Sequence, residues 1–263
     1  ISSCCIKFLL VLIVLTVIAS CEVVRYHVKF TFFTISSAIA ATVCIPLMLP
    51  RIRDWRNALL PAWWVKKCAK ILGITYRIRG KENIVQDSGS IVLINHQSAI
   101  DLCVLGELWG VLRNCTTISK KEVLYLGSFG LASWLWGTIF IDRKKGQEAQ
   151  STVNMKLIIY PEGHRHSGQT LQPLKKGAFH VAIATQSPIQ PVVVSRYFFL
   201  NSKLKRFNSG MSYITILPPI STKGLTKEDL PMLMEKTYEI MNENFVKSSQ
   251  ETLNEYINSL QAV

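Results

Sequence analysis

The hydrophobic positions of this chain form two continuous apolar segments near its start, followed by short apolar runs that alternate with helical patterns. Residues 30–49 contain no charge, and as a helix these twenty residues reach about 30 Å, the thickness of a bilayer core. Residues 8–21 are also uncharged but fewer, and Lys7 precedes them. We therefore predict a membrane anchor of one or two apolar helices within residues 1–50. A signal peptide is the alternative, because Ala19-Ser20-Cys21 has the small residues of a cleavage site.

A basic segment with interleaved tryptophans follows the anchor at residues 51–72. Its charges are almost all positive, with Asp54 alone opposing Arg51, Arg53, Arg56, Lys66, Lys67 and Lys70. Positive flanks stay on the cytoplasmic side of a membrane, and Trp55, Trp63 and Trp64 are typical of helices at headgroup level. The pattern predicts an interfacial helix, with a buried core helix as the alternative.

From residue 73 to 263, β-branched runs alternate with helical patterns. Strands are expected at 75–79, 91–94, 116–119, 138–141, 156–160, 189–194 and 213–217. Helices are expected at 55–72, 99–112, 122–136 and 176–185, and a last helix follows the capping box of Thr226 and Asp229. This alternation predicts an α/β domain, with a mostly parallel mixed sheet flanked by helices.

Composition narrows the range of partners. A net charge of +13 over 263 residues favours anionic ligands, while a hydrophobic content of 49% exceeds what an α/β domain requires. Anionic lipid satisfies both features, and nucleic acid is disfavoured because no zinc-finger, RNP or basic-helix pattern is present. The seven scattered cysteines match neither a disulfide framework nor a metal site, and the histidines show no ligand spacing.

The most informative motif is Asn95-His96-Gln97-Ser98-Ala99-Ile100-Asp101, directly after the expected strand 91–94. Active sites of α/β folds collect at the carboxyl ends of strands. There the Asp101 carboxylate can hold Nδ1–H of His96, which leaves Nε2 free to act as a base. A turn histidine beside an N-capping aspartate is the alternative.

Three further blocks carry charge or turn residues at strand ends. Arg143 closes Gly137-Thr138-Ile139-Phe140-Ile141-Asp142-Arg143, and its guanidinium suits a phosphate. In Tyr160-Pro161-Glu162-Gly163-His164-Arg165, Gly163 permits a tight turn, and Glu162 and Arg165 can converge on a ligand. The last block, Ile189-Gln190-Pro191-Val192-Val193-Val194, carries no chemistry of its own. Solvated surface charge is the alternative for each charged residue.

In order, these blocks resemble the signature of the glycerolipid acyltransferase family, and specifically of its lysophosphatidate (1-acylglycerol-3-phosphate) acyltransferases. The family pattern NHxxxxD, GxxFIDR, FPEGTR and a proline-bounded apolar strand reads here as NHQSAID, GTIFIDR, YPEGHRH and IQPVVV. The resemblance covers about residues 72–230, and the apolar anchor also matches. Two departures stand out: His164 replaces threonine, and the connection between Arg143 and Tyr160 is roughly ten residues shorter than in relatives.

The resemblance implies an activity and a set of roles. His96, with Asp101, would be the base for transfer of a fatty acyl group from acyl-CoA to the sn-2 hydroxyl of lysophosphatidic acid, without a covalent acyl-enzyme. Arg143, Glu162, Gly163 and Arg165, with Lys120, would bind the acceptor. Acyl-CoA is a co-substrate and no cofactor is implied. The expected location is the endoplasmic reticulum membrane, with the catalytic domain facing the cytosol.

Several alternatives to this activity stay open. Glycerol 3-phosphate or another lysophospholipid could be the acceptor, because the same motifs serve it. The short connection and His164 also suit a catalytically impaired relative that only binds membranes. A secreted hydrolase would follow from the signal-peptide interpretation. Ser98 and Cys103 are conceivable covalent nucleophiles, although packing is the simpler role for both. Phe129, Leu131, Trp134, Leu135 and Trp136 suit an acyl tunnel, a bilayer contact or ordinary core packing.

Overall fold

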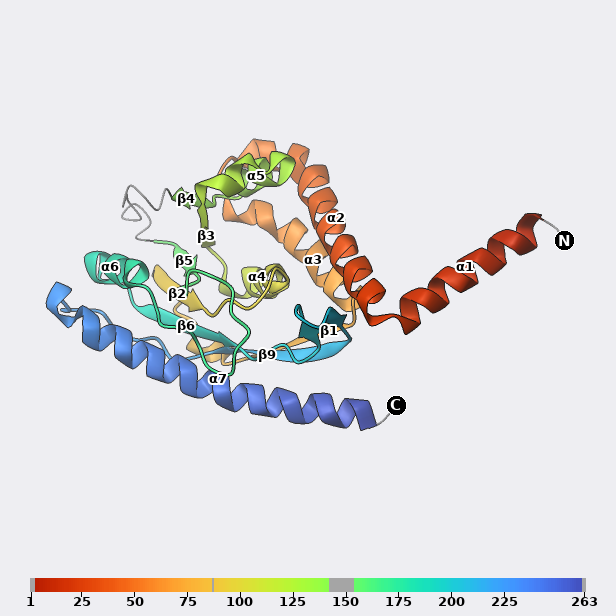
Figure 1. Ribbon diagram of the computed structural model, residues 1–263. Coiled ribbons are helices and arrows are strands. Elements are labelled where there is room, and N and C mark those ends of the chain that lie inside the picture. The colour runs from red at the N-terminus through yellow and green to blue at the C-terminus, as the bar shows by residue number, and fades with distance from the viewer. Residues whose placement is uncertain (1–2, 87, 142–153, 262–263) are drawn as a thin grey trace.

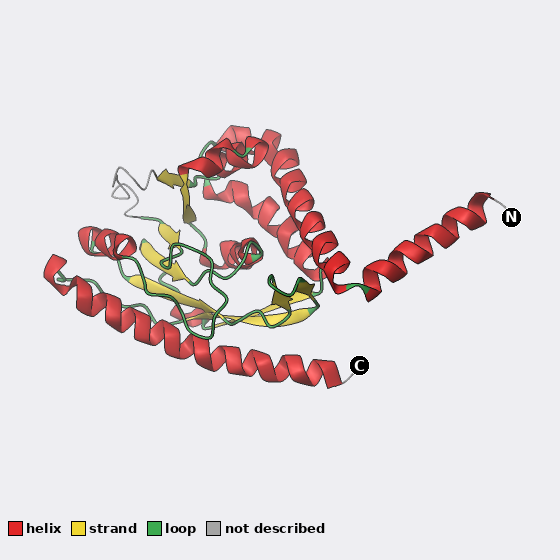
Figure 2. Cartoon of the chain, in the orientation of Figure 1, coloured by secondary structure: helices red, strands yellow, loops and turns green. Residues whose placement is uncertain are grey.

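The computed structural model describes residues 3–86, 88–141 and 154–261 and contains a seven-stranded mixed sheet between two layers of helices (Figures 1 and 2). The sheet order is β1-β9-β6-β2-β5-β3-β4, in which every neighbouring pair is parallel except β6 and β9. Its strands are β1 (Ile74–Arg79), β2 (Ser90–Ile94), β3 (Cys115–Lys120), β4 (Ile139–Ile141), β5 (Lys156–Ile159), β6 (Ile189–Val194) and β9 (Gly210–Ile216). The predicted mostly parallel α/β fold is confirmed.

The central strand β2 shows why the sheet needs helices on both faces. Its five residues are all buried, and successive side chains point to opposite faces. Val92 and Ile94 join one hydrophobic cluster, whereas Ile91 and Leu93 join the other.

One helical layer consists of α2 (Glu22–Met48), α3 (Leu59–Ile71), α4 (Asp101–Leu112) and α5 (Gly127–Leu135) (Figure 1). The opposite layer consists of α6 (Lys176–Thr185) and the long α7 (Leu230–Gln261), which lies across the sheet. The predicted capping box is present, because Thr226 and Asp229 bond each other's backbone at the short helix η5 (Lys227–Asp229) that leads into α7. The remaining short elements are η1 (Leu49–Arg51), η3 (Lys81–Asn83), β7 (Leu200–Asn201) and β8 (Arg206–Phe207).

Three helix predictions differ from the structure at their ends. The segment 55–72 begins with the 3-10 turn η2 (Trp55–Ala58) before α3, and 122–136 is divided into η4 (Lys121–Tyr125) and α5. The division falls at Leu126, whose ψ of 45° is outside the helical range. Helix α4 begins at Asp101 rather than at residue 99.

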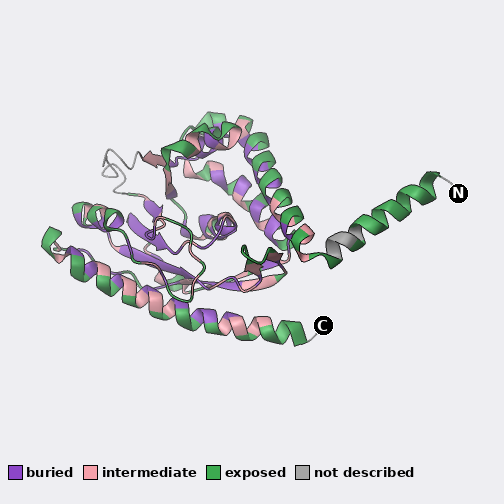
Figure 3. Ribbon diagram, viewed as in Figure 1, coloured by how far each residue is buried: buried purple, intermediate pink, exposed green. Residues whose placement is uncertain are grey.

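The two apolar N-terminal segments behave differently. Helix α1 (Ser3–Ser20) projects away from the rest of the chain with the apolar side chains of residues 8–14 exposed, whereas one face of α2 is buried (Figure 3). Residues 22–51 form the one helical stretch of the described chain that is long and apolar enough to cross a membrane. A signal sequence passes the same test, so the boundaries of the anchor remain a prediction.

Helix α2 is attached to the α/β domain at both ends. Near its start, Arg25 donates to the Asn208 side chain at 2.9 Å. Near its end, the Thr42 hydroxyl donates to Ser128 of α5 at 2.7 Å. Because Ala41 and Met48 also belong to the core cluster of the domain, α2 and the residues after 72 share one packing unit.

The outer surface of α2 and α3 is apolar. Exposed side chains of α2 include Ile35, Ile39, Val43 and Leu47, and those of α3 include Leu59, Leu60, Trp63, Trp64 and Ile71. Trp63 and Trp64 are exposed, and Nε1 of Trp64 donates to the Ser36 hydroxyl of α2 at 2.9 Å, while Val65, Cys68 and Ala69 form the buried face of α3. Exposed apolar surface of this kind is typical of an interaction site.

Candidate active site

His96 and Asp101 lie together where β2 ends and α4 begins. Nδ1 of His96 is 2.6 Å from Oδ2 of Asp101. The same oxygen accepts the backbone N–H groups of Gln97 at 2.7 Å and Ser98 at 3.1 Å. Asp101 therefore shapes the turn as well as the imidazole, which explains why the helix begins at this residue. Its side chain is only 4% exposed, so its charge is held by these donors rather than by water.

The imidazole of His96 faces an internal cavity. Its side chain is 21% exposed, and its ring stacks on that of Tyr160 with centroids 4.2 Å apart. Since Nδ1 is bonded to Asp101, Nε2 is the ring nitrogen available to a molecule bound in the cavity. The structure thus brings the predicted base and its partner together, and their catalytic roles remain predictions.

Glu162 is buried and bonds the protein backbone. Its Oε1 accepts N–H of His96 at 2.8 Å, and its Oε2 accepts N–H of Gln172 at 3.0 Å. Burial raises the pKa of this carboxyl, against the opposing effect of the two backbone hydrogen bonds. The carboxylate ties the loop after β5 to the loop of His96, and it does not line the cavity. Its predicted contact with the acceptor remains a prediction.

The cavity has a volume of about 630 Å³, which is in the range of small-molecule sites. Its polar lining comes from His96, Lys120, Tyr160, Gly163, His164 and Arg165, which lie at or after the carboxyl ends of β2, β3 and β5. Its apolar lining comes mainly from α2, α3, α4, α5 and the residue after α5, and includes Ala41, Val65, Leu102, Trp109, Phe129 and Trp136. The cavity can therefore hold a molecule with an anionic head and an apolar chain.

Four of the predicted acceptor-binding residues can be compared with this cavity. Lys120, at the end of β3, and Arg165 supply positive charge to its lining. Gly163 adopts φ of 74°, which confirms the predicted tight turn, and a Cβ there would meet the Lys175 side chain. Glu162 is not one of the residues that line the cavity. Arg143 lies outside the described residues, as does most of the short connection before Tyr160.

The apolar residues 129–136 differ in their surroundings. Phe129 and Trp136 line the cavity, Leu131 is exposed, Trp134 is half-buried against the core, and Leu135 is buried in it. An acyl tunnel and a bilayer contact stay predictions. Cys103 is fully buried, and burial raises the pKa of its thiol, so packing explains it better than nucleophilic chemistry does.

Sequence reasoning missed residues that surround Asp101 from other elements. The Tyr197 hydroxyl donates to Oδ1 of Asp101 at 2.8 Å, and Tyr160 stacks on His96. Tyr197 follows the carboxyl end of β6, which is parallel to β2. The same strand-end rule that drew attention to His96 could therefore have drawn attention to Tyr197.

A mixed α/β fold with a histidine–aspartate pair at a strand end, facing a cavity with cationic residues in its lining, is typical of an enzyme of group-transfer or hydrolytic chemistry. The acyltransferase family model matches residues 75–195, which include His96, Asp101, Glu162, Gly163 and Arg165. Together with the relatives below, this match shows that the chain belongs to the acyltransferase family and is an acyltransferase.

Characterised relatives are similar over most of the chain. Human 1-acyl-sn-glycerol-3-phosphate acyltransferase alpha is 35% identical over 223 residues, which cover 81% of this chain and 78% of that protein. The human beta enzyme is 34% identical, covering 83% and 81%. The Saccharomyces cerevisiae 1-acyl-sn-glycerol-3-phosphate acyltransferase is 37% identical, covering 77% and 69%.

A solved structure shares the fold. The 1-acyl-sn-glycerophosphate (LPA) acyltransferase PlsC from Thermotoga maritima superposes with a TM-score of 0.65 at 20% identity, covering 85% of this chain and 98% of that one. The shared architecture includes almost the whole of that protein.

Proposed function

We propose that this chain transfers a fatty acyl group from acyl-CoA to the sn-2 hydroxyl of 1-acylglycerol 3-phosphate, which gives phosphatidic acid and CoA. The observation that carries the proposal is the cavity whose lining combines His96 with cationic and apolar side chains. An acceptor with a phosphate and an acyl chain complements both kinds of side chain. The relatives named above act on this acceptor by name, and they cover most of the chain.

The chemistry is a direct transfer at the thioester carbonyl. Nε2 of His96 takes the proton of the acceptor hydroxyl while that oxygen attacks the carbonyl carbon. Asp101 accepts the Nδ1–H hydrogen bond, fixes the tautomer and stabilises the imidazolium as it forms. When the tetrahedral intermediate collapses, the C–S bond breaks, and Nε2 returns the proton to the CoA sulfur. The acceptor is itself the nucleophile, so no acyl-enzyme is required.

Tyr160 supports this proton transfer. Its ring lies against the face of His96 at 4.2 Å, and an aromatic face attracts a cation. The stack therefore restricts rotation of the ring and places an aromatic face beside the imidazolium that forms during transfer. The positive charges of Lys120 and Arg165 in the cavity lining bind the phosphate of the acceptor. By family resemblance, Arg143 adds a third phosphate ligand.

The apolar side chains in the cavity lining favour a membrane as the source of the acceptor and of the acyl donor. Helices α2 and α3 line the cavity with one face and expose apolar side chains on the other. We propose that this outer face docks into the endoplasmic reticulum membrane, with the basic residues 51–70 at its cytosolic surface. An acyl chain then passes from the bilayer into the cavity without crossing water.

The test is acyl transfer by purified protein in anionic vesicles, with radiolabelled oleoyl-CoA and a panel of acceptors. Lysophosphatidic acid should give labelled phosphatidic acid at a rate at least ten times that of glycerol 3-phosphate or lysophosphatidylcholine. Protein precipitated after incubation with the labelled donor alone should carry no label. A preference for another acceptor would contradict the proposed substrate. Labelled protein would contradict a transfer without an acyl-enzyme. Vesicle binding without any transfer would contradict the proposed activity.

A further inference from the structure

The carboxylate of Asp101 has two oxygens, and the proposed mechanism uses one of them. Oδ2 holds His96 and two backbone N–H groups. Oδ1 accepts the hydroxyl of Tyr197 at 2.8 Å. The Tyr197 side chain comes from the segment after β6, about a hundred residues along the chain, and is almost fully buried. Burial, and then the charge of Asp101, raise the pKa of Tyr197, so its hydroxyl stays protonated and remains a donor.

The backbone that carries Tyr197 is joined to the His96 loop by amide side chains. Asn95 bonds both backbone groups of Val194, donating to the carbonyl at 3.0 Å and accepting N–H at 2.7 Å. Gln97 donates to the carbonyls of Val194 at 3.1 Å and Ser195 at 3.0 Å, and accepts N–H of Tyr197 at 3.3 Å. The residues on either side of His96 thus fix the position of Tyr197 relative to Asp101.

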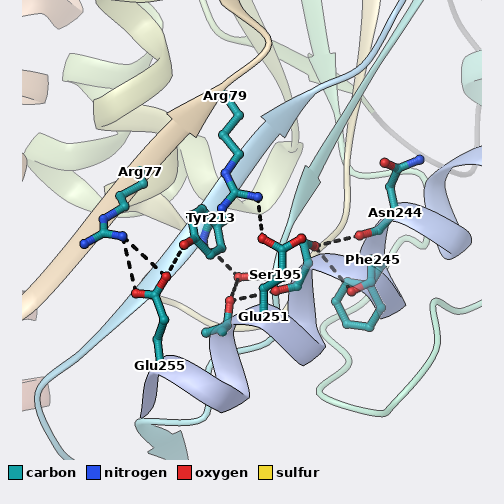
Figure 4. A network of polar contacts seen from close by, with 10 residues as sticks. Arg77, Arg79, Ser195, Tyr213, Asn244, Phe245, Glu251 and Glu255 are labelled. Atoms are coloured by element: carbon teal, nitrogen blue, oxygen red, sulfur yellow. Dashed lines mark hydrogen bonds and ion pairs between the residues drawn. The ribbon is translucent and has the colours of Figure 1, made fainter. Parts of the chain in front are cut away.

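Helix α7 holds the same segment from the opposite side. The Thr252 hydroxyl donates to Oγ of Ser195 at 2.7 Å, and Ser195 also bonds N–H of Tyr213 at 2.9 Å in β9 (Figure 4). One residue further on, N–H of Arg196 donates to the Ser249 hydroxyl at 3.0 Å. Hydrogen bonds from β9, α7 and the His96 loop therefore hold the segment that leads to Tyr197. They restrict the movement of the Tyr197 hydroxyl.

We propose that Tyr197 is a positioning residue for acyl transfer, which acts by holding the Asp101 carboxylate in the orientation that directs Oδ2 to His96. This inference rests on the proposed function, because it assigns a role within that mechanism. A carboxylate that lost its donor at Oδ1 could rotate about its terminal torsion, which is soft. Its bond to Nδ1 would then weaken, and so would its hold on the imidazolium. Tyr197 touches neither substrate in this account.

Packing alone is the competing explanation for Tyr197. Its ring lies edge-on to Tyr76 with centroids 6.4 Å apart and contacts Phe199 at 5.3 Å. Tyr197→Phe separates the two roles, because it retains the ring and removes only the hydroxyl. Tyr213→Phe is the matched control, because Tyr213 is also buried and its hydroxyl bonds the carboxylate of Glu255 instead of that of Asp101 (Figure 4). Its backbone N–H, which bonds Ser195, is unchanged by the substitution.

The experiment measures kcat, KM for both substrates and the thermal midpoint for wild type, Tyr197→Phe and Tyr213→Phe, with lysophosphatidic acid and oleoyl-CoA. For Tyr197→Phe we expect kcat to fall about tenfold, equivalent to about 1.4 kcal/mol of transition-state stabilisation, with both KM values within about twofold of wild type. Tyr213→Phe should keep the wild-type kcat even where its midpoint falls.

Two results would overturn the inference: a kcat of Tyr197→Phe within twofold of wild type, or an equal loss in Tyr213→Phe. Should Tyr197→Phe fail to fold, Gln97→Glu provides the second variant, because it loses the donors to Val194 and Ser195 while retaining the tyrosine. A lower kcat with unchanged KM supports the inference, and an unchanged kcat overturns it. A wild type that transfers no acyl group would instead overturn the proposed function.

Discussion

Glu162→Gln tests whether this carboxylate supports the His96 loop or binds the acceptor. The two oxygens of Glu162 accept N–H of His96 at 2.8 Å and N–H of Gln172 at 3.0 Å. A glutamine in the same position offers one oxygen and one NH₂ group. One of the two backbone N–H groups then faces a donor and has no acceptor in a site that is 2% exposed.

The expected loss of stability follows from that single unsatisfied donor. Leaving a buried N–H without an acceptor costs about 1–3 kcal/mol. For a domain of this size, each kcal/mol lowers Tm by about 2–4 °C, so a central value of about 2 kcal/mol predicts a decrease of about 4–8 °C. Displacement of the loop also moves His96, and a shift of about 1 Å in a catalytic group can cost about a hundredfold in rate. We expect kcat to fall at least tenfold, with little change in KM.

The assay combines thermal unfolding in detergent with initial rates over a range of lysophosphatidic acid concentrations. Glu235→Gln, at an exposed position of α7, is the matched control and should leave Tm and kcat unchanged. If Glu162→Gln instead kept the wild-type Tm and kcat and raised KM for the acceptor, Glu162 would be a substrate ligand and the reasoning would be wrong.

Three further outcomes follow from the site. Arg165→Ala should raise KM for lysophosphatidic acid about tenfold or more while KM for acyl-CoA is unchanged, because Arg165 supplies positive charge to the cavity lining. Ala41→Phe should shift the preferred acceptor to shorter acyl chains, which rates with lysophosphatidic acids of C8 to C18 chains would reveal, whereas Ile39→Phe on the exposed face of α2 should not. The pH dependence of stability concerns Glu162, whose buried carboxyl has a pKa raised above 4.5. The folded protein therefore binds this proton more tightly than the unfolded chain does. The Tm difference between wild type and Glu162→Gln, measured at each pH, should shrink as pH rises from about 4.5 through the raised pKa.

Much of the fold was predictable because local pattern and tertiary packing agree. The run Ile91-Val92-Leu93-Ile94 is apolar on both faces, and it became a central strand with helices on both sides. The helix 176–185 was predicted with its observed ends. The sequence was less informative where side-chain contacts set the end of an element. Asp101 bonds the N–H groups of Gln97 and Ser98, and α4 therefore begins at residue 101, two residues after its predicted start.

The contact between His96 and Asp101 was predictable because the two residues are close in the sequence. Asp101 follows His96 by five positions, so a strand end and a turn were enough to suggest their contact. Tyr197 reaches Asp101 through the parallel pairing of β2 with β6, and no local pattern encodes that pairing. Glu162 shows a different difficulty, because no local pattern predicts that both of its oxygens accept backbone N–H groups. Its predicted contact with the acceptor stays a prediction.

The central claim is that Nε2 of His96 is the base of acyl transfer. Its most direct test is the single-turnover rate of phosphatidic acid formation by His96→Ala beside wild type, with oleoyl-CoA and lysophosphatidic acid in the same vesicles. We predict a loss of about a thousandfold or more, with vesicle binding and Tm close to those of wild type. A variant that retained more than about a tenth of the wild-type rate would contradict the claim.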